Sequence, residues 1–211
     1  FAPGIDELRN LRALLLQANQ LTGPLTGTFN SSVHKSLVTI QLDYNEFTGT
    51  LPSELFSLPA LTTLSIVSSC LHGSFPDNVC DSTAMEALIL YGLTSGASCR
   101  AEQQDWLALH PRASFHGAFP TCLLQLPLLK TLLLSSNALT GKMSTWVVGG
   151  SLLELDLCHN LLSGTISTSV QNHTWLLLDL SHNKLSGDLL PELFAPVNRT
   201  LFQERLPLAV S

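Results

Sequence analysis

The sequence predicts an α/β-type repeat solenoid, and two observations carry this prediction. First, the frame Leu-x-x-Leu-x-Leu-x-x-Asn-x-Leu-x-Gly returns every 23 to 26 residues, and self-similarity at such a period marks a solenoid. Second, apolar positions 1, 4 and 6 followed by Asn do not continue around a helix, which argues against a leucine-rich helical protein. The five complete copies begin at Leu11, Leu37, Leu129, Leu152 and Trp175.

Each part of the frame has a physical role. The last two leucines of Leu-x-x-Leu-x-Leu alternate with an outward residue, as a short strand requires. A single repeat cannot bury its inward leucines, so successive copies must stack. We expect the Asn amide to bond backbone groups of the adjacent turn, where the bend removes ladder bonds. The Gly that follows tolerates backbone angles that a side chain resists.

Two further copies are degenerate. The copy from Leu61 carries Ser69 at the Asn position, and the copy from Met85 carries Leu93 there. The second copy breaks off, and its ending resumes as Phe115-x-Gly-x-Phe-Pro. The surplus is an insertion at about residues 94–113 in a single domain (residues 1–211) of about seven or eight repeats.

The segments that follow the frame, such as Leu51-Pro-Ser-Glu-Leu55 and Phe119-Pro120, complete a Leu-x-Gly-x-Ile-Pro-x-x-Leu pattern. With this pattern the chain resembles the plant-type extracellular leucine-rich repeat family, which comprises receptor-like ectodomains and polygalacturonase-inhibiting proteins. The resemblance covers about residues 8–193 and implies a curved right-handed superhelix, with a parallel concave sheet and a mostly irregular or 3-10 convex side. It also implies a second short sheet from the Gly-x-Ile-Pro segment, and a protein or peptide ligand on the concave face. The chain departs from the family at Ser69, at Leu93, in the insertion and in lacking paired-cysteine caps. We therefore expect a piece of a longer array or irregular ends in place of caps.

The composition of the chain argues against nucleic-acid binding and against a membrane span. Charged residues make up 12% of the chain and the net charge is −6, so nucleic-acid binding has no electrostatic support. No apolar run reaches the length of a bilayer span, so we expect no membrane span in this segment. An anchor or a kinase elsewhere in the full chain stays open. No cofactor is expected.

Cysteines and sequons indicate a secretory route, and so an extracellular or cell-surface location. Cys70 and Cys99 are expected to meet at the edge where the insertion leaves, and Cys80 and Cys122 on neighbouring turns of the outer side. We expect Cys158, the fifth cysteine, to lie on a strand and to remain outside these two pairs. A Cys80–Cys99 pair and five reduced thiols are the alternatives. The three glycosylation sequons begin at Asn30, Asn172 and Asn198.

The outward positions of the strands and of the residues after them form the predicted binding surface. This surface is small and neutral in the middle, and acidic and His-bearing toward the carboxyl end. Carboxylates and imidazoles can bind metals or transfer protons, and a pH-sensitive patch is a further possibility. The alternative, which we favour, is that this repeat family simply fills solvent-facing positions with these residues. We therefore predict no metal site and no catalytic residue. The expected ligand-binding residues are Gln41, Asp43, Tyr44, Tyr91, Glu154, Asp156, His159, Asp179 and His182.

Two further features are candidates for ligand contact: a pair of tyrosines on this surface and the insertion. Tyr44 and Tyr91 are candidate contact residues because exposed aromatics contribute large contact area, although ordinary packing at the sheet edge would also place them there. The insertion reads as a short helix at about 101–109, with Trp106 packing it onto the solenoid. It either helps to set specificity or is a tolerated structural addition.

The expected function is a non-catalytic protein or peptide recognition module, the ectodomain of a receptor-like or secreted protein. The alternatives are an inhibitor of a secreted glycan hydrolase and an intracellular scaffold. An enzyme is least expected, because no nucleophile–base pair or phosphate loop is present in the sequence.

Overall fold

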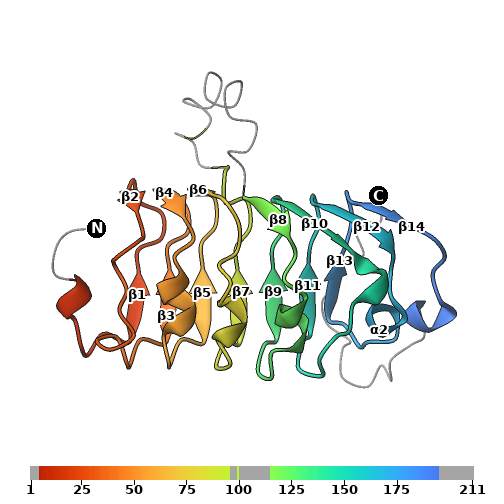
Figure 1. Cartoon of the computed structure of the whole chain (residues 1–211), viewed down its shortest axis with the longest axis horizontal. Helices are drawn as coiled ribbons and strands as arrows, with labels where there is room; N and C mark the ends of the chain where they lie inside the picture. The colour runs from red at the N-terminus through yellow and green to blue at the C-terminus, as the bar shows by residue number, and fades with distance from the viewer. Residues whose placement is uncertain (1–4, 96–98, 100–114, 195–211) are drawn as a thin grey trace.

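The computed structural model describes residues 5–95, Cys99 and residues 115–194 (Figure 1). The predicted helix at 101–109, its Trp106 and the sequon residue Asn198 lie outside the described residues.

The repeats build a seven-stranded parallel sheet in the order β1-β3-β5-β7-β9-β11-β13 (Figure 1). Equivalent frame positions pair across repeats, for example Leu14 with Ile40 and Leu155 with Leu178. This register confirms the predicted solenoid of stacked parallel strands. The strands are β1 (Ala13–Leu15), β3 (Thr39–Gln41), β5 (Thr63–Ser65), β7 (Ala87–Ile89), β9 (Thr131–Leu133), β11 (Glu154–Asp156) and β13 (Leu177–Asp179).

A second row of parallel strands follows the Asn turns, and it is split where the insertion begins. β2 (Thr22–Pro24), β4 (Glu46–Thr50) and β6 (Cys70–His72) form one sheet. β8 (His116–Ala118), β10 (Ala138–Lys142), β12 (Leu161–Thr165) and β14 (Lys184–Ser186) form the other. A single bridge between Gly73 and Phe115 links the two sheets. The repeat therefore resumes at Phe115, where the sequence predicts.

The return segments contain short helices, which lie in front of the strands in Figure 1. Pro52 and Pro120 precede η2 and η4 with φ near −75°, the value that the proline ring fixes. The helices are η1 (Ile5–Glu7), η2 (Ser53–Ser57), η3 (Val79–Asp81), η4 (Thr121–Gln125), η5 (Met143–Thr145), α2 (Thr168–Gln171) and η6 (Pro191–Phe194).

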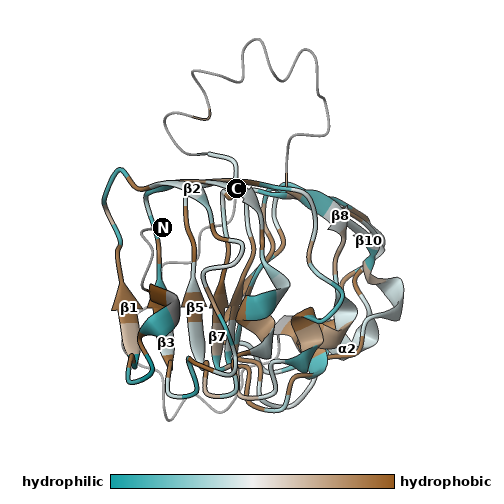
Figure 2. Ribbon diagram, turned by 60° about the vertical axis from the view of Figure 1, so that its left-hand side comes forward, coloured by the Kyte–Doolittle hydropathy of each residue, from teal (hydrophilic) through white to brown (hydrophobic). Residues whose placement is uncertain are grey.

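The core is a continuous column of frame leucines between the strands and the short helices. Ile40, Leu64 and Leu132 have no exposed surface, whereas Leu14 in the first strand is 8% exposed and Leu178 in the last is only partly buried. Burial falls at the ends because the first and last strands have a neighbour on one side only. Figure 2 shows hydrophobic colour on β1 and in strands behind it, and hydrophilic colour in many of the turns.

The frame asparagines tie neighbouring turns together, as the sequence predicts. The amide of Asn45 donates to the carbonyls of Leu16 and Leu42, and its oxygen accepts from the backbone N–H of Leu21 in the preceding repeat. Asn137 performs the same function across the insertion, because it donates to Leu90 and accepts from the backbone of Leu93.

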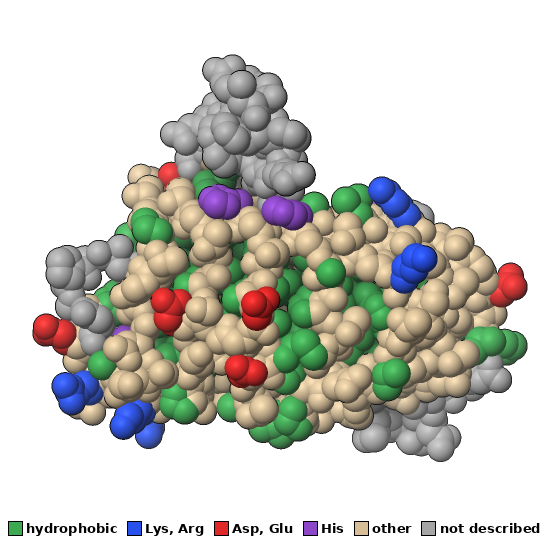
Figure 3. All heavy atoms as spheres, viewed as in Figure 1, with side chains coloured by type: hydrophobic (Ala, Val, Ile, Leu, Met, Phe, Trp, Pro, Cys, Tyr) green, Lys and Arg blue, Asp and Glu red, His purple; other side chains and the backbone are tan. Residues whose placement is uncertain are grey.

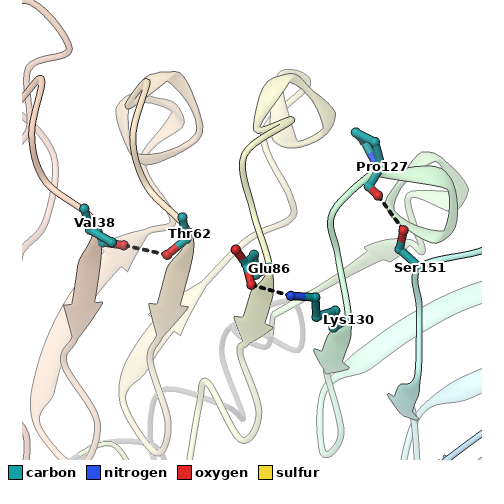
Figure 4. A network of polar contacts seen from close by, with 6 residues as sticks. All are labelled: Val38, Thr62, Glu86, Pro127, Lys130 and Ser151. Carbon is teal, nitrogen blue, oxygen red and sulfur yellow. Dashed lines mark hydrogen bonds and ion pairs between the residues drawn. The ribbon is translucent and has the colours of Figure 1, made fainter.

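Polar contacts also link the repeats at the starts of the strands, as Figure 4 shows. Thr62 donates to the Val38 carbonyl, Ser151 donates to the Pro127 carbonyl, and Lys130 lies 2.7 Å from the Glu86 carboxylate. Among the described residues, this last contact is the one ion pair of the structure.

Two disulfides flank the split in the second row. Cys70 is bonded to Cys99 and Cys80 to Cys122, with Cα–Cα distances of 5.6 and 6.0 Å. These are the pairs that the repeat frame predicts. Cys158 is a free thiol, and it lies two residues beyond the end of β11 at Asp156. Its assignment to a strand is therefore wrong, because the chain already turns toward Asn160 at that point.

Candidate functional site

The seven-strand face is the side of the seven-stranded sheet that points away from the core. It carries the first and third residue of each strand, and the two residues between the third frame leucine and the frame Asn of each repeat. All nine ligand-binding residues predicted from the sequence project from this face or from the turn at its end.

The last position before each Asn is a turn rather than a strand position. Tyr44, His159 and His182 have φ between 53° and 54°, in the left-handed region that L-residues rarely occupy. The turn keeps its ladder bonds, since the Tyr44 and His159 amides donate to the next repeat, to Val67 and Ser181. The side chains at this position therefore stack along the edge of the sheet. Equivalent positions hold Ala18, Ser68, Ser136 and, at φ 59°, Gly92.

A tyrosine and carboxylate cluster occupies the amino-terminal half of the face. Tyr44 is 58% exposed, the largest exposure among the large hydrophobic side chains of the described residues. Burial raises the pKa of Tyr91, and a side-chain hydrogen bond with Tyr44 and the nearby charge of Asp43 add to this. The outward-pointing Val67 lies in the repeat between the two tyrosines and is only 3% exposed. The cluster thus bridges three repeats.

Asp43 is held in this cluster by neutral donors. The Ser65 hydroxyl donates to its carboxylate at 2.6 Å. Burial raises the pKa of Asp43, and the hydrogen bonds from Ser65 and from the Val67 backbone partly oppose the rise. Gln41, in the adjacent strand β3, lies beside the cluster and receives a hydrogen bond from Gln17 in the preceding repeat. Ser65 is not among the predicted binding residues, because Ser is common at outward strand positions and does not stand out in the sequence.

An acidic cluster occupies the carboxyl-terminal half. Asp156 and Asp179 are register partners in β11 and β13, and their carboxylates and the Cys158 sulfur lie within 4.8 Å of one another. Each carboxylate accepts a backbone N–H two residues later, from Cys158 and from Ser181. Glu154 accepts from the Thr131 hydroxyl at 2.9 Å.

The pKa of the Cys158 thiol reflects its burial and the neighbouring carboxylates. The pKa of this thiol is raised to about 12, mainly by burial and then by the hydrogen bond to Asp156 and the charges of Asp156 and Asp179. At neutral pH the thiol is therefore protonated, and two carboxylates remain as ligands for a cation. Structural zinc sites use four protein ligands and calcium sites use six to eight oxygens, so these three groups fall short of either.

The two histidines at the edge of this cluster stack on each other. The rings of His159 and His182 are nearly parallel, with an interplanar angle of 8° and centroids 4.0 Å apart. This stack follows from their equivalent positions in adjacent left-handed turns, which lie about one strand spacing apart.

The opposite side of the solenoid carries the short helices and is different in character. In Figure 3, which shows this side, the surface is mostly uncharged and its few charged side chains are dispersed. A polar cavity of about 440 Å³ lies here between the first and second repeats, lined among others by Asn30, Ser53 and Ser57. The sequon residues Asn30 and Asn172 are both exposed, so glycosylation at them stays a prediction that the structure permits.

The described residues include no helix with the length and apolar character that a membrane crossing requires.

The Leucine Rich Repeat family model matches residues 36–58, 151–173 and 176–195. No curated protein is significantly similar in sequence. Among solved structures, the chain resembles the ectodomain of the receptor kinase GASSHO1/SCHENGEN3 from Arabidopsis thaliana, solved in complex with CASPARIAN STRIP INTEGRITY FACTOR 2. The identity is 25% and the TM-score 0.68 over 88% of this chain and 20% of that one.

Two further structures show the same similarity. The Arabidopsis receptor kinase HAESA ectodomain, in complex with an IDA peptide hormone ligand, is 25% identical with a TM-score of 0.61 over 87% of this chain and 32% of its own. Pollen Receptor Kinase 3 is 22% identical with a TM-score of 0.63 over 85% of this chain and 77% of its own, which supports the fold alone. The chain is thus a leucine-rich repeat solenoid. Within that class it is similar to plant receptor-kinase ectodomains, and it spans only a fifth to a third of the GASSHO1/SCHENGEN3 and HAESA ectodomains.

Proposed function

We propose that this chain is a non-catalytic recognition module that binds a protein or peptide on the seven-strand face. The observation that carries the proposal is the tyrosine cluster, in which Tyr44 is 58% exposed in the turn after β3, at the edge of the seven-stranded sheet. Tyrosine is enriched among the few residues that dominate binding energy, since it offers a large and rigid contact area.

The fold supports this use of the face. A solenoid stacks its repeats into an extended surface that can contact a long ligand at many points. Two of the similar ectodomains were solved with peptide or integrity-factor ligands. Groups placed for acid–base chemistry are instead engaged structurally: Asp156 and Asp179 accept backbone N–H groups, and the Cys158 thiol is protonated at neutral pH.

We further propose an extracellular or cell-surface location, in a receptor-like or secreted protein. The two disulfides support it, because such bonds persist in oxidising compartments. Expression through a secretory pathway, followed by glycosidase treatment, tests this directly. A mobility shift that disappears in Asn30→Gln/Asn172→Gln/Asn198→Gln supports the proposal, and an unglycosylated chain with reduced thiols contradicts it.

The binding proposal is tested with a displayed library of random peptides that is panned against the folded chain. Tyr44→Ala should weaken the enriched peptides by about 2 kcal/mol, or roughly thirtyfold, as expected for a tyrosine that dominates an interface. Val147→Ala is the matched control, because Val147 is similarly exposed, at 56%, but lies on the helix-bearing side. Equal losses in both variants would place the contact elsewhere, and no enrichment at all would contradict peptide binding.

A further inference from the structure

The seven-strand face has a one-sided charge. Its outward positions hold four carboxylates, those of Asp43, Glu154, Asp156 and Asp179, and no Lys or Arg. Two cations lie one residue before a strand of this sheet: Arg12 before β1 and Lys130 before β9. Lys130, just before the strand next to the acidic cluster, is paired with Glu86 at 2.7 Å, whereas the carboxylates of the face have no such partner among the described residues.

None of the four carboxylates is paired with a cation among the described residues. Their hydrogen-bond donors are neutral: the hydroxyls of Ser65 and Thr131 and the backbone N–H groups of Cys158 and Ser181. Neutral donors fix the orientation of a carboxylate but leave its charge uncompensated. After burial, the charges of Asp156 and Asp179 also contribute to the raised pKa of Cys158.

The spacing of these groups matches an extended chain that runs across the strands. Asp156 and Asp179 carry oxygens within 4.8 Å of each other, a separation that one guanidinium can bridge with its fork of N–H donors. From β3, beside the tyrosine cluster, to β11 there are four strand spacings, or about 19 Å at 4.8 Å each. An extended peptide covers that distance in about six residues.

We infer that the seven-strand face binds an extended basic peptide. One Arg or Lys of the peptide bridges Asp156 and Asp179, and a segment about six residues away packs on Tyr44 and Tyr91. This inference rests on the proposed recognition function and specifies the chemistry of the ligand. Charge complementarity argues for a basic partner, since an acidic one would face four uncompensated carboxylates, and a neutral one would bury Asp156 and Asp179 without a counter-charge.

The test uses a displayed library of random peptides of about twelve residues, twice the predicted span. The library is panned against the wild-type chain near 0.15 M salt, where the Debye length is about 8 Å and nonspecific attraction is screened. The best peptide is then synthesised, and its dissociation constant is measured against two double variants. Asp156→Asn/Asp179→Asn removes the pair, and Glu54→Gln/Asp77→Asn removes two charges at and beside the short helices.

The expected result is enrichment of peptides that carry Arg or Lys, with binding weakened about tenfold to a hundredfold in Asp156→Asn/Asp179→Asn, as for loss of a charge-assisted contact. The control double variant should stay within about twofold of wild type, a change under 0.5 kcal/mol. If the first double variant does not fold, Asp179→Asn alone serves, because β13 is the last strand of the sheet; a loss of about tenfold is then expected.

The possible results distinguish a failure of the basic-peptide inference from a failure of the proposed recognition function. Neutral or acidic enriched peptides that lose affinity in Tyr44→Ala would overturn the basic-ligand inference and leave the recognition function standing. Basic peptides that bind equally to wild type and to Asp156→Asn/Asp179→Asn would also overturn the inference. If no peptide is enriched, the recognition function fails and the inference fails with it.

Discussion

Asn160 offers a quantitative test of the frame asparagine as the link between repeats. Its side chain is 4% exposed and makes four hydrogen bonds. Its oxygen accepts from the Leu139 amide, and its nitrogen donates to the carbonyls of Leu134, Leu157 and Cys158. Two of these partners, Leu134 and Leu139, belong to the preceding repeat. Asn160→Ala would therefore leave the buried Leu139 amide without a partner, whereas the carbonyls of Leu134, Leu157 and Cys158 keep hydrogen bonds from Asn137, Asn183 and Ser136.

Asn19 provides the matched control at the same frame position. Its side chain is exposed, and it donates only to Leu16 and Gln17 within its own turn. Water can replace these bonds in Asn19→Ala, so the expected cost is about 0.5–1 kcal/mol. Asn160→Ala loses about three net hydrogen bonds near 1 kcal/mol each and leaves the Leu139 amide unsatisfied, for an expected cost of about 3–4 kcal/mol.

Urea denaturation followed by circular dichroism measures the difference. With an m-value of about 2 kcal/mol/M, Asn160→Ala should lower the midpoint by about 1.5–2 M and Asn19→Ala by less than about 0.5 M. Asn160→Asp would bury a carboxylate against the carbonyls of Leu134, Leu157 and Cys158, so it should lower the midpoint at least as far as Asn160→Ala. Equal midpoint shifts for Asn19→Ala and Asn160→Ala would refute the claim that the contacts between repeats, rather than the turn itself, need asparagine.

Three further predictions concern the seven-strand face and its turns. The Cys158 thiol, with its pKa of about 12, should react with iodoacetamide far more slowly at pH 8 than an unperturbed thiol. Asp156→Asn should accelerate the reaction, because it removes a charge that raises this pKa. An unchanged rate in Asp156→Asn would contradict a contribution of that charge to the pKa. Because burial raises the pKa of Asp43 above 3.8 in the folded state, its charged form costs stability as pH rises through that pKa. Asp43→Asn should thus gain melting temperature over wild type at pH 7, a gain that shrinks below pH 3.8; a gap that widens in acid would reverse the sign. Ala18 at φ 58° carries left-handed strain, so Ala18→Gly should stabilise by about 0.5–1 kcal/mol. Gly92→Ala should destabilise, because its Cβ would lie 2.6 Å from the Ser95 hydroxyl oxygen; thermal melts that rank the two variants the other way would contradict this reasoning.

The solenoid was predictable because its determinants are local and recur. Leu, Asn and Gly at fixed offsets specify a strand, a turn and a second strand, and stacking then fixes the register. Even the resumption at Phe115 followed from the frame alone. The cysteine pairs followed for the same reason, since repeat offsets convert sequence positions into neighbours in space.

The details of the face were less predictable, because they depend on side chains from different repeats. The last position before each Asn looks like one more outward strand position, yet Tyr44 and His159 sit in left-handed turns. Period-two alternation contains no information about where φ changes sign. The contact between Tyr44 and Tyr91 and the burial of Val67 depend on how large side chains of different repeats pack, which no single repeat encodes.

The break after Leu93 has a consequence for how this molecule can change over time. Three contacts join the repeats on the two sides of this break: the hydrogen bond from the Leu93 amide to Asn137, the Gly73–Phe115 bridge and the Cys80–Cys122 disulfide. None of these contacts uses residues 100–114. We therefore expect changes of length or sequence within residues 100–114 to leave the register of the described strands unchanged. A loss of folding on shortening that stretch would contradict this expectation.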